Sequence, residues 1–156
     1  MPIDDAGFKL AMSHFASGVT VVTTEHEGVR YGMTVSAFAS LSLHPPLVLI
    51  CIEKSVKSHD AIANSKKFGV SLLAQDQAAL SNRFASRRDD KFEGVATHNG
   101  ELDVPLIDGA VCTLDCRLHA SLPQGDHTIF VGEVVDAHSN ESAPLVYFRS
   151  GYRELA

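Results

Sequence analysis

Residues 32–52 read Gly-Met-Thr-Val-Ser-Ala-Phe-Ala-Ser-Leu-Ser-Leu-His-Pro-Pro-Leu-Val-Leu-Ile-Cys-Ile, and this stretch decides the fold class. Its middle part, Phe38 to Leu43, alternates apolar and small polar residues, as strands with one buried face do. Its last part, Leu47 to Ile52, is continuously apolar, which is typical of a strand buried on both sides. Because His44-Pro45-Pro46 separates the two parts, the stretch predicts two strands with a break between them.

Strands also dominate outward from this stretch. Val19 to Thr24 consists only of β-branched residues, which favour strands. After a hairpin connection at Glu25 to Gly28, a second strand is expected over Val29 to Met33. Alternation indicates antiparallel pairing, so the predicted fold class is mainly β: an antiparallel barrel, closed or partly closed, with peripheral helices. Four further strands are expected, at residues 68–73, 111–120, 128–136 and 145–148.

The first predicted helix lies near the start of the chain. Asp4 or Asp5 can cap its N-terminus through a side-chain oxygen. Gly18 is expected to end the helical segment. Its apolar residues have the spacing i, i+4, i+7 and form one stripe: Phe8, Met12 and Phe15.

Two more helices are predicted in the middle of the chain. Ser58 can cap the N-terminus of the first of them, and Lys66 and Lys67 would lie in its last turn, where cations suit the helix dipole. Asp76 is expected to open the second, whose members are Ala79, Leu80, Arg83 and Phe84.

Length and charge limit the classes of function. A chain of 156 residues suits one domain, over residues 1–156. The formal net charge is −6 and no stripe of Lys and Arg is present, so nucleic acid is not an expected partner. No apolar run reaches the length of about 18 residues that a membrane helix needs. Met1 to Asp5 lacks the basic start of a signal peptide, so we expect a cytoplasmic protein without membrane association.

The three cysteines do not form a disulfide framework. Cys112 and Cys116 lie four residues apart in an alternating segment, which places their Cα atoms about 13 Å apart in a strand. A disulfide needs less than about 7 Å. They are therefore interpreted as small core residues, and no metal site is predicted, because no cysteine pair or histidine has zinc-ligand spacing.

Four small hydroxyl residues in the quoted stretch have two interpretations. Small residues let a planar ligand approach the backbone, and hydroxyls can bond its heteroatoms. Alternatively the stretch is an edge strand whose hydroxyls face water, which is the interpretation that residue types alone favour. The four residues are Thr34, Ser36, Ser40 and Ser42. No phosphate-binding loop, dinucleotide fingerprint or nucleophile elbow accompanies them.

Several segments together make the chain similar to a known family. The quoted stretch up to Val48 and the segment Gly125-Asp126-His127 are the specific ones, and the similarity runs from about Phe8 to Tyr152. The chain resembles the flavin reductase-like family with the FMN-binding split-barrel fold, the short reductase components of two-component flavin-dependent monooxygenases. The weaker matching segments are residues 15–23, 68–73, 83–85 and 128–134.

This resemblance implies a homodimer that holds FMN or FAD in a groove between the barrel and the neighbouring subunit. It implies that the isoalloxazine ring is bordered by Met33, Thr34, Val35, Ser36, Ala37, Cys51 and Ile52. Ser55 and Ser58 would reach the ribityl phosphate, and Phe84 would line the same groove. A helix that starts at Ser58, with Lys57 beside it, would also suit an anion, although an ordinary cap with a solvated lysine is the alternative.

The resemblance further implies that NADH or NADPH docks against the flavin. His127 would position the nicotinamide, and Tyr152 could stack there. The alternatives are an exposed turn histidine and a C-terminal packing aromatic. Arg87, Arg88 and Lys91 are either solvated or in contact with the dinucleotide.

The reaction implied is hydride transfer from nicotinamide C4 to flavin N5, which requires no protein acid or base. Reduced flavin would then leave to serve a partner monooxygenase. Two other functions stay open: a non-enzymatic FMN-binding electron carrier on the same fold, and a ligand-binding barrel without flavin.

Overall fold

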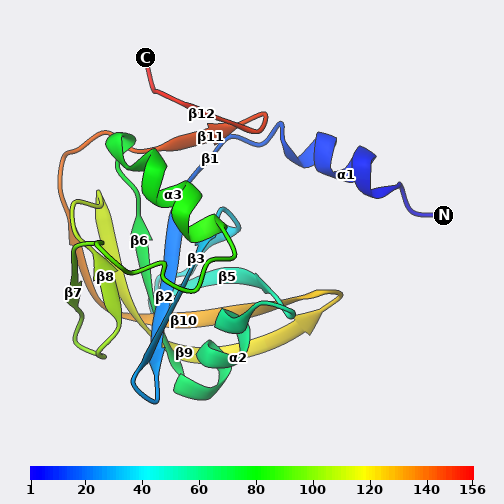
Figure 1. The fold of residues 1–156 in the computed structure, drawn as a ribbon. Coiled ribbons are helices and arrows are strands. Elements are labelled where there is room, and N and C mark those ends of the chain that lie inside the picture. Colours follow the sequence, from blue (N-terminus) through cyan, green and yellow to red (C-terminus); the bar gives the residue numbers. More distant parts are fainter.

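The structure, a computed structural model, describes residues 1–156 and is built around one seven-stranded antiparallel sheet (Figure 1). The strand order is β3-β2-β6-β9-β10-β5-β4. These strands are β2 (Thr20–His26), β3 (Val29–Val35), β4 (Phe38–Ser42), β5 (Leu47–Glu53), β6 (Lys67–Leu72), β9 (Cys112–Gln124) and β10 (His127–Ser139).

The sheet curls but does not close, because its edge strands β3 and β4 do not pair with each other. Ser36 and Ala37 connect these two edges at one corner. The prediction of a mainly β, antiparallel split barrel with peripheral helices is therefore confirmed, and the fully closed alternative is excluded.

Two small sheets complete the strand inventory. In one of them a segment that follows α1 meets the C-terminal segment: β1 (Ser17–Gly18) pairs with β11 (Val146–Phe148), which pairs with β12 (Gly151–Arg153). The other is the hairpin of β7 (Thr97–Asn99) and β8 (Pro105–Ile107), which the sequence pattern does not predict.

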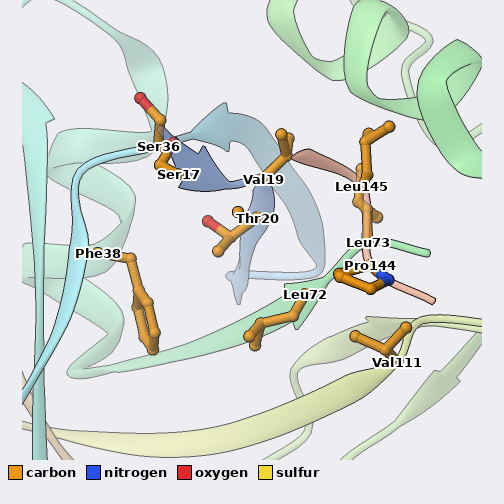
Figure 2. A pocket seen from close by; sticks show the side chains of 11 residues that line it. Ser17, Val19, Thr20, Ser36, Phe38, Leu72, Leu73, Val111, Pro144 and Leu145 are labelled. Carbon is orange, nitrogen blue, oxygen red and sulfur yellow. The ribbon is translucent and has the colours of Figure 1, made fainter. Parts of the chain in front are cut away.

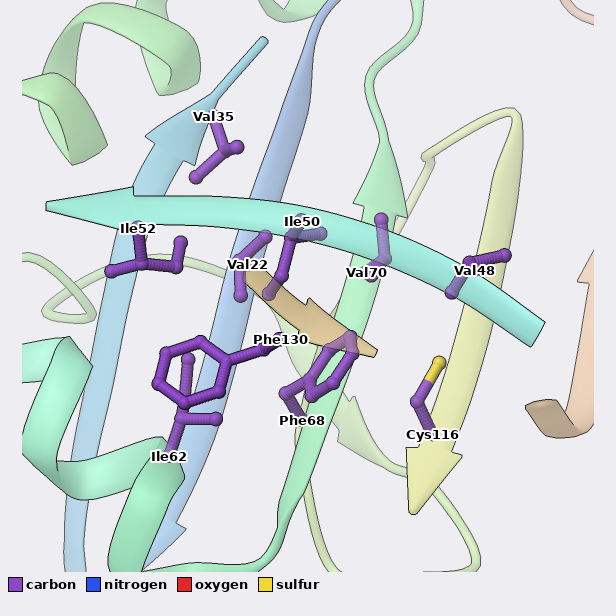
Figure 3. Packing of buried hydrophobic residues seen from close by; sticks show 10 residues of the cluster. All are labelled: Val22, Val35, Val48, Ile50, Ile52, Ile62, Phe68, Val70, Cys116 and Phe130. Carbon is purple, nitrogen blue, oxygen red and sulfur yellow. The ribbon is translucent and has the colours of Figure 1, made fainter. Parts of the chain in front are cut away.

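A cluster of ten buried residues fills the barrel (Figure 3). Phe68 of β6 and Phe130 of β10 are its largest members, and both have no exposed surface. Gly132 makes room for Phe68, because a Cβ atom at this position would lie 2.5 Å from the Cζ atom of that ring. The other members are Val22, Val35, Val48, Ile50, Ile52, Ile62, Val70 and Cys116.

Helix α2 (Lys57–Ser65) closes one side of the barrel through Ala61 and Ile62. The prediction that Ser58 caps it was wrong: Val56 is the N-cap residue and makes no side-chain capping bond. Val56 packs against the barrel core in an extended conformation, so the helix starts one residue after it. Lys66 lies just beyond the last turn in a left-handed conformation, and Lys67 already begins β6, which corrects their predicted helical positions.

Helix α3 (Ala78–Ala85) covers a second core cluster around Phe84. A single 3-10 turn, η1 (Gln75–Gln77), precedes it, so Asp76 does not open the α-helix itself. Instead, the Oε1 atom of Gln77 accepts a hydrogen bond of 2.9 Å from the N–H group of Ala74. The side chain of Gln77 thus satisfies a backbone donor ahead of η1, while the start of α3 itself has no side-chain capping bond.

Helix α1 (Asp5–Met12) is capped by Asp4, as predicted, with Oδ1 accepting from the N–H group of Gly7 at 2.8 Å. It ends at Met12, and residues 13–15 turn the chain before Gly18 is reached. Of the predicted stripe only Phe8 and Met12 lie in this helix, and the chain covers none of the three residues: Phe8 is 56% exposed, Met12 55% and Phe15 78%. In Figure 1 the helix stands away from the sheet.

All three cysteines are free, as expected. Cys116 is a core residue, whereas Cys112 and Cys51 are half-buried. Burial, with the carboxylate of Asp115 adding to it, raises the pKa of the Cys116 thiol to about 12. None of the helices has both the length and the apolar character to cross a membrane.

Candidate functional site

The candidate site is built around the corner between β3 and β4. Ser36 and Ala37 are exposed there, and the side chain of Ser36 makes no hydrogen bond within the chain. The carbonyl oxygen of Ala37 accepts a hydrogen bond of 3.1 Å from the N–H group of Cys51. This bond joins two segments that the family resemblance assigns to the flavin ring, residues 33–37 and residues 51–52.

Thr34 is not free to serve a ligand as a donor. Its hydroxyl donates to the carbonyl oxygen of Ser81 on α3 at a distance of 2.6 Å. Only the lone pairs of its Oγ1 atom remain for a second partner. The hydroxyl-rich stretch is therefore partly structural, because Thr34 ties the edge strand β3 to α3.

Three predicted site residues lie behind the surface. Val35, Ile52 and Phe84 are buried, so their side chains cannot border a ligand in this structure. The Phe84 ring packs against Phe92 with centroids 5.1 Å apart. It also fills the space beside Gly32, where a Cβ atom would lie 2.8 Å from the ring. The expectation that Phe84 lines the groove is corrected accordingly: its ring supports β3 from beneath. Met33 and Cys51 are half-buried.

Polar donors gather at the N-terminus of α2. The hydroxyls of Ser55 and Ser58 make no hydrogen bond within the chain, although Ser58 is only 7% exposed. The backbone N–H groups of Lys57 and Ser58 have no partner within the chain, whereas that of His59 donates to the carbonyl oxygen of Val56 at 3.1 Å. Free N–H groups at the start of a helix carry the positive end of the helix dipole. The Nζ atom of Lys57 lies 3.2 Å from the Oδ1 atom of Asp89, and both side chains are exposed. Such a surface pair is weak, so Lys57 can turn to another anion.

His127 is the first residue of β10 and follows a turn at Gly125 and Asp126 that hydrogen bonds from Lys54 hold in place. The N–H group of Lys54 donates to the carbonyl oxygen of Asp126 at 2.9 Å, and its Nζ donates to the carbonyl oxygen of Gly125 at 2.7 Å. The Nδ1 atom of His127 lies 2.7 Å from the Oδ1 atom of Asp126. This hydrogen bond and the charge of His127, with a smaller effect of Lys54, hold the pKa of Asp126 below its usual value.

A carboxylate can only accept, so Nδ1 of His127 carries the hydrogen and Nε2 is left for a ligand. Sequence reasoning missed Lys54 and Asp126 as the residues that orient His127. The Gly-Asp-His motif contained part of this signal, whereas the contribution of Lys54 depends on strand register.

The pairing of β5 with β10 places His127 near Cys51 and Ile52, which the resemblance assigns to the flavin ring. Cys51 lies opposite Ile129, Ile52 opposite Thr128, and Glu53 opposite His127. We call the surface formed by residues 36–37, 51–58 and 126–127 the rim. It carries residues that were predicted to contact the flavin ring, the flavin phosphate and the nicotinamide.

Tyr152 does not join this rim within one chain. Its hydroxyl lies 2.7 Å from the Oγ atom of Ser81 and 2.8 Å from the Oδ1 atom of Asn82. Because Oδ1 only accepts, the tyrosine donates to Asn82 and accepts from Ser81. Its ring meets that of Tyr147 edge-on with centroids 5.6 Å apart. Tyr152 thus packs on α3, as the alternative interpretation had it.

The basic residues after α3 have separate roles. Arg88 forms a two-pronged pair with Asp90, which holds the pKa of that carboxyl at about 2, and Arg87 makes no hydrogen bond. The Nζ atom of Lys91 donates to the carbonyl oxygens of Gly32 and Phe84, each at 3.0 Å. Burial lowers the pKa of Lys91. Lys91 therefore fastens the loop to β3 and α3, a role that the charge pattern did not predict.

A mainly apolar hollow of about 160 Å³ adjoins the corner (Figure 2). Ser36 and Phe38 form one side of it, and Leu72, Val111 and Leu145 lie across from them. Small-molecule sites usually enclose about 300–1,000 Å³, so this hollow is too small for a flavin ring system. Of the predicted site residues only Ser36 lines the hollow, so the hollow adjoins the corner and does not extend to His127 or to the start of α2.

Comparison with known proteins agrees with this architecture. Residues 12–156 match the family described as flavin reductase like domain. The chain therefore belongs to the flavin reductase-like family. It is 44% identical over 149 residues to the reductase component of 4-hydroxyphenylacetate 3-monooxygenase from Thermus thermophilus, covering 95% of this chain and 95% of the relative.

Two other flavin reductase-like proteins extend the comparison. The reductase component of a 4-nitrophenol 4-monooxygenase/4-nitrocatechol 2-monooxygenase from Rhodococcus opacus is 42% identical over 151 residues, covering 97% of this chain and 81% of the relative. The solved structure of the NADH:FAD oxidoreductase SgcE6 of Streptomyces globisporus C-1027, in complex with NAD and FAD fragments, superposes with a TM-score of 0.94. It is 37% identical and covers 98% of this chain and 93% of that one.

Proposed function

We propose that this protein is an NAD(P)H:flavin oxidoreductase that supplies reduced flavin to a partner monooxygenase. The observation that carries the proposal is the rim formed by the bond from Cys51 to Ala37 and the pairing of β5 with β10. The proposal is supported by the exposed corner at Ser36 and Ala37, the polar donors at the start of α2 and the hydrogen-bonded His127, which lie on neighbouring segments. The relatives named as reductase components of monooxygenases support the proposed role.

The residues on the rim fit FMN or FAD. Ser36 and Ala37 expose backbone and a small side chain, which allows a planar ring to approach. Ser55, Lys57, Ser58 and the first turn of α2 provide hydroxyl, ammonium and N–H donors for a phosphate. A flavin held there would supply the hydride acceptor for the reduced nicotinamide. The protein has to bind and align the two rings, and no side chain has to move a proton.

His127 is proposed to orient NADH or NADPH. The carboxylate of Asp126 fixes the tautomer of its ring, and Lys54 fixes the turn on which it stands. We expect His127→Ala to raise KM for the nicotinamide more than it lowers kcat, because the residue acts in binding. An unchanged KM with kcat abolished would instead assign His127 to proton transfer.

We further propose that the active form is a homodimer with one functional domain in each subunit. Ser36, Ala37 and Ser55 on the rim are exposed, and the apolar stripe of α1 has no cover within its own chain. A second copy can cover both. A cytoplasmic location belongs to the same proposal, since three free cysteines suit a reducing compartment.

The test is oxidation of NADH and of NADPH by the purified protein in the presence of added FMN or FAD. We expect steady loss of reduced nicotinamide that depends on added flavin. The variant Ser55→Ala/Ser58→Ala should raise KM for flavin, whereas the control Ser40→Ala, on the exposed edge strand β4 and away from α2, should not. A protein that binds FMN yet never oxidises either nicotinamide would be an electron carrier. A protein whose addition leaves flavin fluorescence unquenched would be neither a flavin reductase nor a flavin-binding electron carrier.

A further inference from the structure

One histidine bridges helix α2 to strand β10. His59 is the third residue of α2, and its side chain is 15% exposed. Its Nε2 atom lies 2.7 Å from the Oγ1 atom of Thr128, and its ring packs on Phe130 with centroids 5.2 Å apart. Thr128 and Phe130 are both buried. No other side-chain hydrogen bond joins α2 to β10.

The bridge has a defined polarity. The Nδ1 atom of His59 lies 2.8 Å from the Oδ1 atom of Asp60. Because that carboxylate can only accept, Nδ1 carries the hydrogen, and Nε2 of the neutral ring accepts from the hydroxyl of Thr128. If the ring gains a second hydrogen, Nε2 donates to the same oxygen. The bond therefore persists in either form of the ring.

The two ends of the bridge lie next to the two halves of the rim. His59 follows Ser58 directly, at the donor cluster of α2. Thr128 follows His127 directly, and lies opposite Ile52 in the pairing of β5 with β10. The side chain of one residue thus connects the phosphate-type donors to the strand that carries the oriented histidine.

We propose that His59 is a positioning residue that holds the start of β10, and with it His127, in place against the N-terminus of α2. This inference rests on the proposed function, because it assigns the two ends of the bridge to flavin phosphate and nicotinamide. His59 touches neither ligand in this proposal. It acts through Thr128 on the placement of His127.

The test compares His59→Leu with His59→Gln, whose amide can reach Thr128. We expect His59→Leu to raise KM for NADH about 3- to 10-fold, the size of one lost half-buried hydrogen bond, with kcat changed less than about 2-fold. His59→Gln should recover most of the loss. Thr128→Val should have the same effect as His59→Leu, and Thr128→Ser should not.

His138→Leu is the matched control, because His138 also lies on β10 and bonds to Asp136 at 2.9 Å, but at the opposite end of the strand. The double variant His59→Leu/Thr128→Val should be no worse than either single variant, since both remove the same bond. Additive losses, an unchanged KM for NADH, or a rise in KM for flavin alone would overturn the proposal.

A second readout does not depend on activity. In the flavin-free protein, amide hydrogen exchange over residues 126–129 should be faster in His59→Leu than in wild type, and should be unchanged in His138→Leu. Faster exchange in a protein that proves inactive would contradict the proposed function and still support the bridge. Exchange equal to wild type in His59→Leu would overturn the bridge whatever the activity.

Discussion

Helices α1 and α2 are of similar length and each has an apolar side, but only one of them is buried by its own chain. α2 places Ala61 and Ile62 in the barrel core, and Ile62 has no exposed surface. α1 buries none of its residues. An amphipathic pattern therefore predicts that a helix has a face to cover, but it does not predict which surface covers it.

The contrast between the two helices is tested first by shortening a buried side chain of α2. Ile62→Ala should lower the free energy of unfolding by about 2–5 kcal/mol, because it leaves a cavity beneath α2. Leu10→Ala in α1, where Leu10 is 66% exposed, should change it by less than about 0.5 kcal/mol. Urea unfolding measures both. Equal losses would show that α1 is packed as tightly as α2.

Cys116 reports on the same core by its reactivity. With a pKa of about 12 instead of 9.0, its thiolate fraction near pH 8 is about 1,000-fold smaller than that of a free thiol. Alkylation mapped by mass spectrometry should label Cys51 and Cys112 long before Cys116, and Ile62→Ala should accelerate labelling of Cys116.

The pH dependence of stability follows from the same shift. Above pH 9 the unfolded thiol ionises while the folded one stays protonated. The contribution of the protonated Cys116 thiol to the free energy of unfolding is therefore complete below pH 9, and it is lost as the pH rises toward 12. Rapid alkylation of native Cys116 would contradict this placement of the thiol.

The exposed side of α1 can be tested through self-association. Phe8→Ser/Met12→Ser should raise the dimer dissociation constant about 10- to 100-fold, because it removes apolar surface from the stripe. Sedimentation equilibrium measures this. Leu10→Ser is the control, since Leu10 lies on the other face of the same helix. The idea fails if both variants associate as the wild type does.

The smallest expected effect concerns the end of α2. Lys66 has a φ of +62°, a conformation that glycine adopts more easily. Lys66→Gly should therefore raise the free energy of unfolding by about 0.5–1 kcal/mol. Lys67→Gly, one residue later and within β6, should lower it. Thermal unfolding of the two variants checks the opposite signs.

Much of the sheet could be predicted because its signal is local. The alternation of Phe38 to Leu43 and the apolar run of Leu47 to Ile52 both became strands, but their predicted burial was wrong. Leu41 and Leu43 are exposed, and only one face of β5 is fully buried. The hairpin of β7 and β8 carried no such pattern. Ser58 was expected to cap α2, but the helix begins at Lys57 after Val56. The packing of Val56 against the core, a tertiary contact that the sequence does not reveal, sets this start.

Site residues that belong to a local sequence motif could be predicted from the sequence. Contacts that depend on how β5 and α2 lie against β10 could not. Gly125-Asp126-His127 marked the turn, but the clamp by Lys54 and the bridge from His59 require β5 and α2 to lie beside β10. Phe84 was assigned to the groove from resemblance, whereas its ring is buried against Gly32. Tyr152 was placed beside His127, although its strand belongs to another sheet.

The pairing of β1 with β11, in which Ser17 lies opposite Tyr147, has a consequence for synthesis on the ribosome. Residues 18–146 separate the two, so β1 cannot pair until β11 has left the exit tunnel. Translation and completion of the fold are thus sequential events. A nascent chain released early would lack the partner for its own beginning and would expose unpaired strand edges to other nascent chains.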